Sequence, residues 1–171
     1  MFRSIPLLLV ILALCINVAL SAQAPDITLK DINNKSVTLS DLYSENVVLI
    51  EFWSTTCEPC KKQLPKMQAL LDKYGDKGLV VVSIATDSAR MMSKVKPYVN
   101  GNRYTFITLH DPDQKAWKAF HAPAEPYTII VDKGGEVAYV HIGYNPGDEY
   151  EMESVVVNLL GIEGTWKKLT D

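Results

Sequence analysis

The most constraining feature of the sequence is a Cys-Glu-Pro-Cys motif that directly follows an apolar segment. Residues 47–52 read VVLIEF, a run rich in β-branched side chains and typical of a strand that is buried on both faces. Cys57 is expected at the N-cap of a helix over residues 58–74, in which Pro59 occupies the first turn. Pro65 lies inside that helix and is predicted to kink it. The segment therefore predicts a strand, a tight turn and a helix that starts at the cysteine pair.

This arrangement suits reversible thiol chemistry. Two residues between cysteines on the first turn of a helix bring the sulfurs close enough to form a disulfide. The free N–H groups and the positive end of the helix dipole favour a thiolate on Cys57, which is the species that attacks disulfides. Cys60, one turn inside the helix, is expected to be buried and to act as the resolving thiol.

A Cys-x-x-Cys pair also occurs as half of a zinc site or as a structural disulfide. A zinc site needs about two further Cys or His ligands at suitable spacing. The third cysteine, Cys15, lies in a segment expected to be removed, and His110, His121 and His141 are scattered along the chain. We therefore favour redox chemistry and expect no bound metal and no cofactor other than the redox-active disulfide itself.

Residues 1–24 are predicted to be a targeting segment outside the folded domain. They contain a single charge, Arg3, a long apolar region, and the small-x-small sequence Ala22-Gln23-Ala24, which predicts cleavage before Pro25. An uncleaved membrane anchor is the alternative, because the apolar run is long for a signal peptide. Lipidation at Cys15 is disfavoured because Leu14 precedes it.

Removal of this segment leaves one domain, residues 25–171, with Cys57 and Cys60 as its cysteines. Because Arg3 is lost, the net charge changes from −3 to −4, and this mild acidity gives no sign of nucleic-acid binding. The chain is expected in an exported, periplasmic or extracytoplasmic compartment where disulfides persist.

The rest of the chain alternates strands and helices. We expect a β-hairpin with its turn at Asn33-Asn34, and a short helical turn capped by Ser40 and Asp41. Further strands are expected over residues 79–85, 106–109, 127–131 and 137–142, and further helices over residues 89–99, 113–121 and 148–160. This order predicts an α/β fold: a mixed central sheet flanked by helices, with an N-terminal β-hairpin. Cys57 would lie at the carboxyl end of its strand, where open sheets carry their sites.

Three segments resemble a known family. FWSTTCEPC after a buried strand, Pro65 in the helix and PYTIIVDKGGEV near the C-terminus resemble the thioredoxin-like fold. The hairpin, the secretory segment and the insertion at residues 89–103 narrow the resemblance to thiol–disulfide oxidoreductases of the TlpA/ResA type. The resemblance covers essentially all of residues 25–171. It implies that Cys57 is the exposed nucleophile, that Cys60 is the buried resolving thiol, and that Pro126 is the cis-proline beside them.

Glu51 interrupts the apolar strand and resembles the buried carboxylate that many thioredoxins place beneath the resolving cysteine. Burial should raise its pKa, so that it can exchange a proton with Cys60 near neutral pH. A structural pairing of Glu51 with a buried lysine is the alternative, but charged side chains are seldom buried without a functional reason.

Two further acids are unusual for the family. Glu58 lies between the cysteines, and Glu125 directly precedes Pro126. We expect both to lie near Cys57, to raise its pKa and to discourage acidic partners; the alternative is that they are solvated surface residues. Thr56 replaces the tryptophan that usually precedes the first cysteine, and Trp53 remains as either a packing or a contact residue.

The leading hypothesis is an exported disulfide reductase. Its substrates would be thiols and disulfides of exported proteins, and the resemblance implies apocytochrome c among them. Such a compartment supplies no free reductant, so a membrane electron donor must restore the dithiol. We expect a monomer with no nucleic-acid partner.

Two alternatives remain. Peroxidase relatives carry Thr or Ser three positions before the reactive cysteine, where this chain has Ser54, and a proline where it has Ile50. A copper-handling or other metal-binding module is the other alternative, since two thiolates near His141 would suit a soft metal.

Overall fold

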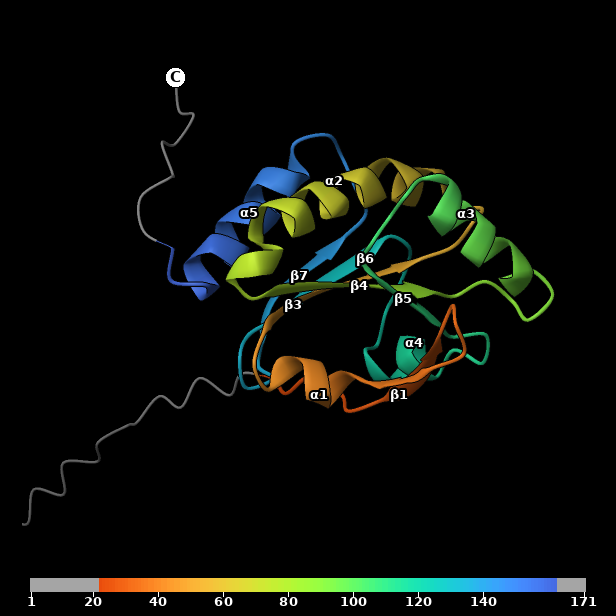
Figure 1. Ribbon diagram of the computed structural model, residues 1–171, viewed down its shortest axis with the longest axis horizontal. Helices are drawn as coiled ribbons and strands as arrows, with labels where there is room; N and C mark the ends of the chain where they lie inside the picture. Colours follow the sequence, from red (N-terminus) through yellow and green to blue (C-terminus); the bar gives the residue numbers. More distant parts are fainter. Residues whose placement is uncertain (1–21, 163–171) are drawn as a thin grey trace, which may run out of the picture.

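A seven-stranded mixed sheet with helices on both faces forms the protein, as described for residues 22–162 by a computed structural model (Figure 1). The strands are β1 (Thr28–Asp31), β2 (Ser36–Thr38), β3 (Val47–Trp53), β4 (Leu79–Ala85), β5 (Ile107–His110), β6 (Tyr127–Val131) and β7 (Val137–Ile142). Their order across the sheet is β2-β1-β5-β4-β3-β6-β7, in which β3, β4 and β5 are parallel and the remaining neighbours antiparallel. The fold is thus the α/β arrangement with an N-terminal hairpin that the sequence predicts.

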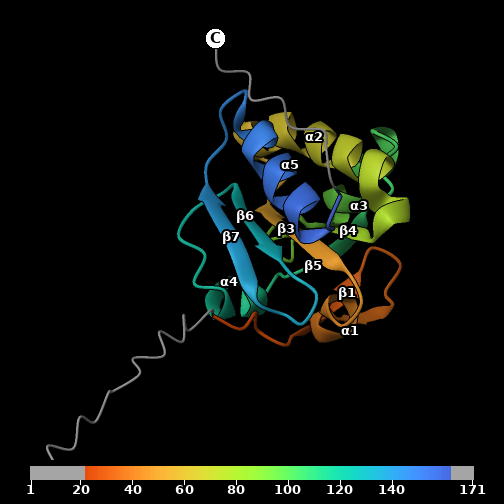
Figure 2. The same ribbon diagram turned by 90° about the vertical axis from the view of Figure 1, so that its left-hand side faces the viewer.

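The helices form one layer on each face of the sheet. They are α1 (Leu39–Tyr43), α2 (Glu58–Tyr74), α3 (Val95–Gly101), α4 (Lys115–Ala119) and α5 (Asp148–Leu159). Helices α2, α3 and α5 cover one face, and α1 and α4 cover the other (Figures 1 and 2). No helix within residues 22–162 combines the length and the apolar composition needed to cross a membrane.

Strand β3 lies at the centre of the core, and all seven of its residues are buried. Leu49 and Trp53 pack with α2 on one face, while Ile50 and Phe52 pack towards α1 and α4 on the other. Burial of one such side chain stabilises the fold by about 1.5–3 kcal/mol. The two-sided apolar core fixes the position of β3, and with it the loop that carries Cys57.

A row of polar side chains crosses the core on the α2 face of the sheet. Glu51 pairs in register with Thr128 of β6 and with Ser83 of β4, and Ser83 donates to Thr108 of β5 over 3.0 Å. Gln63 of α2 donates to the Thr128 hydroxyl over 2.7 Å. Each of these five residues is at most 2% exposed, so the row brings a carboxyl group into the interior.

Several element boundaries differ from the expectation. The helix expected over residues 89–99 is replaced by a turn, a short 3-10 segment (Met92–Lys94) and α3. Pro97 lies in the first turn of α3, where its missing N–H removes no helical hydrogen bond, whereas inside a helix that began at residue 89 it would remove one. Asp87, just before this segment, caps no helix there, because it accepts hydrogen bonds from Thr55.

The other short helices differ in their ends. Helix α1 starts at Leu39 with Thr38 at its N-cap, so Ser40 and Asp41 do not cap it, and the Ser40 N–H bonds to Asp26. Helix α4 is shorter than the expected 113–121, because Asp111 accepts from the N–H groups of Lys115 and Trp117. Strand β5 is shifted by one residue, and on α5 the buried residues are Met152, Val156 and Val157, with Val155, Leu159 and Leu160 only half-buried.

The N-terminal part of the described chain contacts the start of β7. Gln23 forms an antiparallel bridge with Glu136, and Ala24 N donates to the Gly135 carbonyl over 2.8 Å. The predicted cleavage site lies within this pairing, whereas residues 1–21, including Cys15, lie outside the described residues. The division of the chain at residue 24 stays a prediction.

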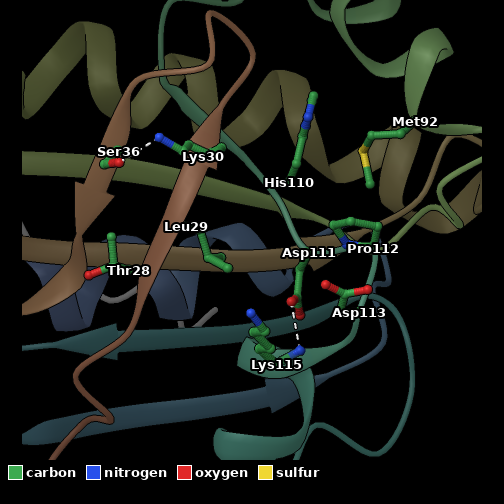
Figure 3. Close-up of a pocket in the computed structure, with 10 residues that line it drawn as sticks. All are labelled: Thr28, Leu29, Lys30, Ser36, Met92, His110, Asp111, Pro112, Asp113 and Lys115. Atoms are coloured by element: carbon green, nitrogen blue, oxygen red, sulfur yellow. Dashed lines mark hydrogen bonds between the residues drawn. The ribbon is translucent and has the colours of Figure 1, made fainter.

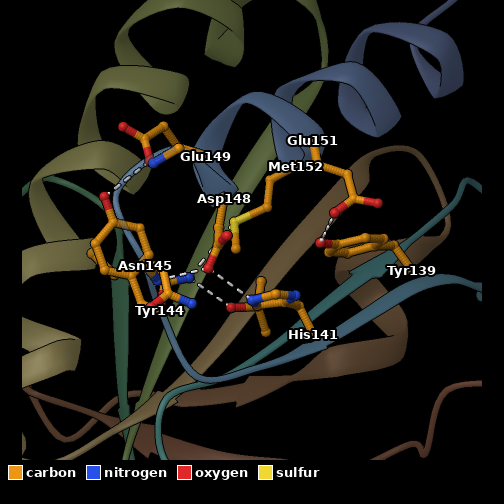
Figure 4. A network of polar contacts seen from close by, with 11 residues as sticks. Tyr139, His141, Tyr144, Asn145, Asp148, Glu149, Glu151 and Met152 are labelled. Atoms are coloured by element: carbon orange, nitrogen blue, oxygen red, sulfur yellow. Dashed lines mark hydrogen bonds and ion pairs between the residues drawn. The ribbon is translucent and has the colours of Figure 1, made fainter.

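A second polar network fastens α5 to β7 and α2 (Figure 4). Glu149 accepts from the Tyr144 hydroxyl over 2.9 Å and the Gly147 N–H over 2.8 Å, and it pairs with Lys66 at 3.0 Å. Burial alone would raise the pKa of Glu149, but these donors and its own N–H lower that pKa to about 2.

This network predicts a pH-dependent contribution to stability. The folded-state pKa of Glu149 lies below its unfolded value, so its contribution is present above about pH 4.5 and is lost as the pH falls towards 2. We expect Glu149→Gln to lower the free energy of unfolding by about 1–2 kcal/mol at pH 6 and by less at pH 3. Urea unfolding at both pH values measures this, with the exposed Glu45→Gln as the control. Equal losses at both pH values would contradict the assignment.

Glu51 should have the opposite effect on the pH dependence of stability. Burial, followed by the charge of Glu125, raises its pKa well above the ordinary value, so the folded protein retains a proton that the unfolded chain releases. Stability should therefore fall as the pH rises from about 4.5 towards the raised pKa. The Glu51→Gln variant does not share this loss. We therefore expect the difference in free energy of unfolding, variant minus wild type, to increase by about 1–3 kcal/mol as the pH rises from 4.5 to 8. A difference between the two proteins that does not change with pH would rule out a neutral buried Glu51.

Candidate active site

Cys57 and Cys60 form a disulfide at the N-terminus of α2. Their Cα atoms are 5.3 Å apart, within the usual range for a disulfide. Cys57 is the N-cap residue, with an extended backbone, and its sulfur accepts a hydrogen bond from the Cys60 N–H over 3.2 Å. Cys57 is half-buried and Cys60 is fully buried. The two sulfurs therefore differ in access, as a nucleophile and a resolving thiol require.

The start of α2 follows from local sequence. Glu58 and Pro59 form its first turn, where the missing N–H of proline removes no helical hydrogen bond. A helix of 17 residues directs its positive dipole end at Cys57. Pro65 lies inside α2 as expected; the kink there stays a prediction.

Glu125 and Pro126 lie beside the disulfide. The peptide bond between them is cis, the geometry implied by the resemblance. A Glu125 carboxylate oxygen and the two sulfurs all lie within 4.8 Å of one another. The carboxylate accepts from Ser54 Oγ over 2.8 Å through Oε2, and from the Thr86 hydroxyl through Oε1. Residues that follow β3 and β4 thus hold Glu125, which lies two residues before β6.

Glu51 lies on the α2 side of β3, the face on which Leu49 and Trp53 pack into one cluster with Cys60. It is fully buried, and neither carboxylate oxygen has a hydrogen-bond partner among the described residues. No buried lysine pairs with Glu51 within residues 22–162, so the alternative role, a structural ion pair with a lysine, is not observed there. The Gln63 Oε1 atom is another buried acceptor without a partner in the same part of the chain. A proton on Glu51 would provide a donor in a region that otherwise holds unmatched acceptors.

Glu58 and Trp53 lie differently from Glu125. The Glu58 side chain is 75% exposed and forms an ion pair with Lys61 at 2.8 Å, and this pairing lowers the pKa of Glu58. Trp53 is fully buried and packs against the Tyr98 ring at 5.3 Å, which makes it a packing residue. Of the two unusual acids, only Glu125 is placed against the sulfurs.

Four supporting residues had no role in the sequence prediction of the disulfide site. Buried Asp87 accepts from both the N–H and the hydroxyl of Thr55, which fixes the loop before Cys57. Thr86 holds Glu125, and Gln63 borders Glu51 across Thr128. One weak indication of the role of Gln63 is present in the sequence, since this polar residue lies three residues after Cys60 on the apolar face of α2. The roles of Asp87, Thr55 and Thr86 could not be predicted, because they depend on which strand ends lie side by side in the folded sheet.

Two other polar regions are separate from the cysteine pair. His141 bonds to Asp148 at 3.0 Å and stacks on Tyr139, so its ring is engaged between β7 and α5 (Figure 4). A cavity of about 400 Å³ lies between β1, the end of β5 and the start of α4 (Figure 3). Residues such as Lys30, His110 and Lys115 line it, and neither cysteine does.

Comparisons with known proteins agree with this geometry. The model of the AhpC/TSA family matches residues 20–140. The thiol-disulfide oxidoreductase ResA of Bacillus thuringiensis is 31% identical over 129 residues, which are 75% of this chain and 73% of the relative. The thioredoxin-like protein YneN of Bacillus subtilis is 31% identical over 132 residues, or 77% of this chain and 76% of the relative.

A solved structure shares both the fold and part of the sequence. It is a Chlorobium tepidum protein described under the name thiol:disulfide interchange protein DsbE, with 27% identity and a TM-score of 0.77. The similarity covers 82% of this chain and 97% of the other. With a cysteine pair at the start of α2, a thioredoxin-like fold and these relatives, the chain belongs to the AhpC/TSA family and is a thiol–disulfide oxidoreductase of the TlpA/ResA type.

Proposed function

We propose that this oxidoreductase works as a reductase of disulfides in exported proteins. The observation that carries the proposal is the unequal access of the two sulfurs: Cys57 is half-buried at the surface, whereas Cys60 is fully buried. A substrate disulfide can reach Cys57 first, and Cys60 can then reach only the sulfur of Cys57. Apocytochrome c is the client class that the resemblance implies.

The reaction has two exchange steps. The Cys57 thiolate attacks one sulfur of the substrate disulfide, so that a mixed disulfide forms and the other substrate sulfur leaves as a thiolate. Cys60, deprotonated, then attacks the Cys57 sulfur, re-forms the Cys57–Cys60 disulfide and releases the second substrate thiolate. Two electrons pass from the cysteine pair to the substrate. A membrane electron donor must return two electrons and two protons for another cycle.

Glu51 in its ionised form, which becomes populated as the pH approaches its raised pKa, is proposed to take the proton that Cys60 loses. Both residues lie on the α2 face of β3, with Leu49 and Trp53 of β3 packed into the same cluster as Cys60. Because burial raises the Glu51 pKa, the carboxyl can exchange a proton closer to neutral pH than an exposed glutamate can. Its role is to hold or accept a proton at Oε1 or Oε2.

Replacement of Cys60 tests the order of the two steps. We expect Cys60→Ala to accumulate a mixed disulfide with a substrate protein, because the second attack is lost. Nonreducing electrophoresis and mass spectrometry would detect an adduct that dithiothreitol releases. Cys57→Ala is the matched variant and should form no such adduct.

Two outcomes would contradict this scheme. Equal adduct formation by Cys57→Ala and Cys60→Ala would exclude Cys57 as the first nucleophile. Continued turnover of a peroxide by Cys60→Ala, without reduction of disulfides, would favour the peroxidase alternative. Ser54 argues against that alternative, because its hydroxyl donates to Glu125.

A further inference from the structure

Glu125 has a fixed carboxylate at the entrance to the redox site. Its two oxygens are held by hydroxyl groups from two different strand ends, Ser54 after β3 and Thr86 after β4. The side chain is half-buried, so it is both oriented by the protein and accessible from solvent. One of its oxygens is within 4.8 Å of both sulfurs. A substrate whose disulfide reaches Cys57 must therefore pass close to this charge.

No cation of the described chain neutralises Glu125. The ion pairs within residues 22–162 join Lys61 to Glu58, Lys66 to Glu149, Lys73 to Glu153 and His141 to Asp148. The other acid beside the cysteines, Glu58, is thus paired with Lys61. Burial raises the pKa of Glu51 and favours its neutral form. The unpaired negative charge at the sulfurs comes from Glu125.

We propose that Glu125 is a specificity-determining residue that selects substrates with a lysine or arginine next to the disulfide; this inference rests on the proposed reductase function. A cationic side chain at that position would pair with the carboxylate as the substrate disulfide approaches Cys57. An acidic side chain there would be repelled. Two unit charges about 4 Å apart in water interact strongly enough for roughly a fivefold change in an equilibrium constant, and a Lys-to-Glu change reverses the sign of the interaction.

The same charge also acts on the nucleophile. A carboxylate close to a sulfur disfavours the thiolate form of Cys57, against the helix dipole that favours it. A substrate cation bound at Glu125 offsets this repulsion and increases the thiolate fraction while the substrate is bound. Selection is therefore expected both in binding and in the rate of the first attack.

Two peptides test the inference. Each contains one intramolecular disulfide, and they are identical except for Lys or Glu next to the attacked cysteine. The full-length chain is reduced beforehand, separated from reductant and mixed with each peptide, and the second-order rate of peptide reduction is measured at low and high salt. We expect the wild type to reduce the Lys peptide about tenfold faster at low salt, with a smaller ratio at high salt.

Variants of Glu125 separate the effect of its charge on substrate preference from any effect on folding. Glu125→Gln should bring the rate ratio to within about twofold and lower the pKa of Cys57, measured from the pH dependence of its alkylation. Glu125→Asp retains the charge and should retain a preference for the Lys peptide, which keeps the test valid if the Gln variant folds poorly. Glu45→Gln is the control of equal net charge, because Glu45 is exposed and precedes β3, at the end opposite the cysteines.

The outcomes distinguish the two proposals. If the wild type reduces both peptides at equal rates, or if Glu125→Gln keeps the full preference, the inference about Glu125 is wrong while the reductase function stands. If the wild type reduces neither peptide although its cysteines are free thiols, the reductase function is wrong and the inference falls with it.

Discussion

The contact on which the active site depends is the cap of α2 by the sulfur of Cys57. The Cys60 N–H donates to that sulfur, so the residue that performs the chemistry also satisfies a free backbone donor of the helix. The fully buried strand β3 holds the preceding loop, and Asp87 fixes Thr55 within it. The sulfur is therefore positioned by the core of the domain and by the start of α2 together.

Two carboxyl groups act on this site from different environments. Glu51 lies in the interior, where burial favours the protonated form and suits exchange of a proton. Glu125 lies at the rim, held by two hydroxyl groups and accessible to a substrate. The same residue type therefore has two separate proposed tasks, proton exchange in the interior and recognition of charge beside the sulfurs.

The sequence was most informative where one segment determines its own structure. Strands β3, β4, β6 and β7 were predictable because each is an apolar or alternating run between turn residues. Helix α2 was predictable because Cys57 and Pro59 mark its start and Gly75 its end. The expected helix from residue 89 was wrong, because Asp87 has a tertiary partner and Pro97 lies in the first turn of a helix that begins only at Val95.

The site was less predictable than the strands, because several of its contacts join distant segments. Glu58 and Glu125 were both expected near Cys57, because Glu58 lies between the cysteines and Glu125 directly precedes Pro126. The structure separates them: Glu58 pairs with Lys61 one turn along the helix, whereas Glu125 meets Thr86 and Ser54 across strand ends. Gln63 becomes important only because Thr128 and Glu51 lie opposite each other in the sheet.

The most direct test of the account is the redox equilibrium of the cysteine pair. The full-length protein would be equilibrated in buffers of graded dithiol-to-disulfide ratio, quenched with acid and alkylated, and its mass measured. The account predicts that only two species interconvert along a two-electron curve, with Cys57 and Cys60 either both alkylated or both protected, while Cys15 is treated alike in the two species. Cysteines that stay free, or stay linked, across the whole range would contradict a reversible Cys57–Cys60 couple.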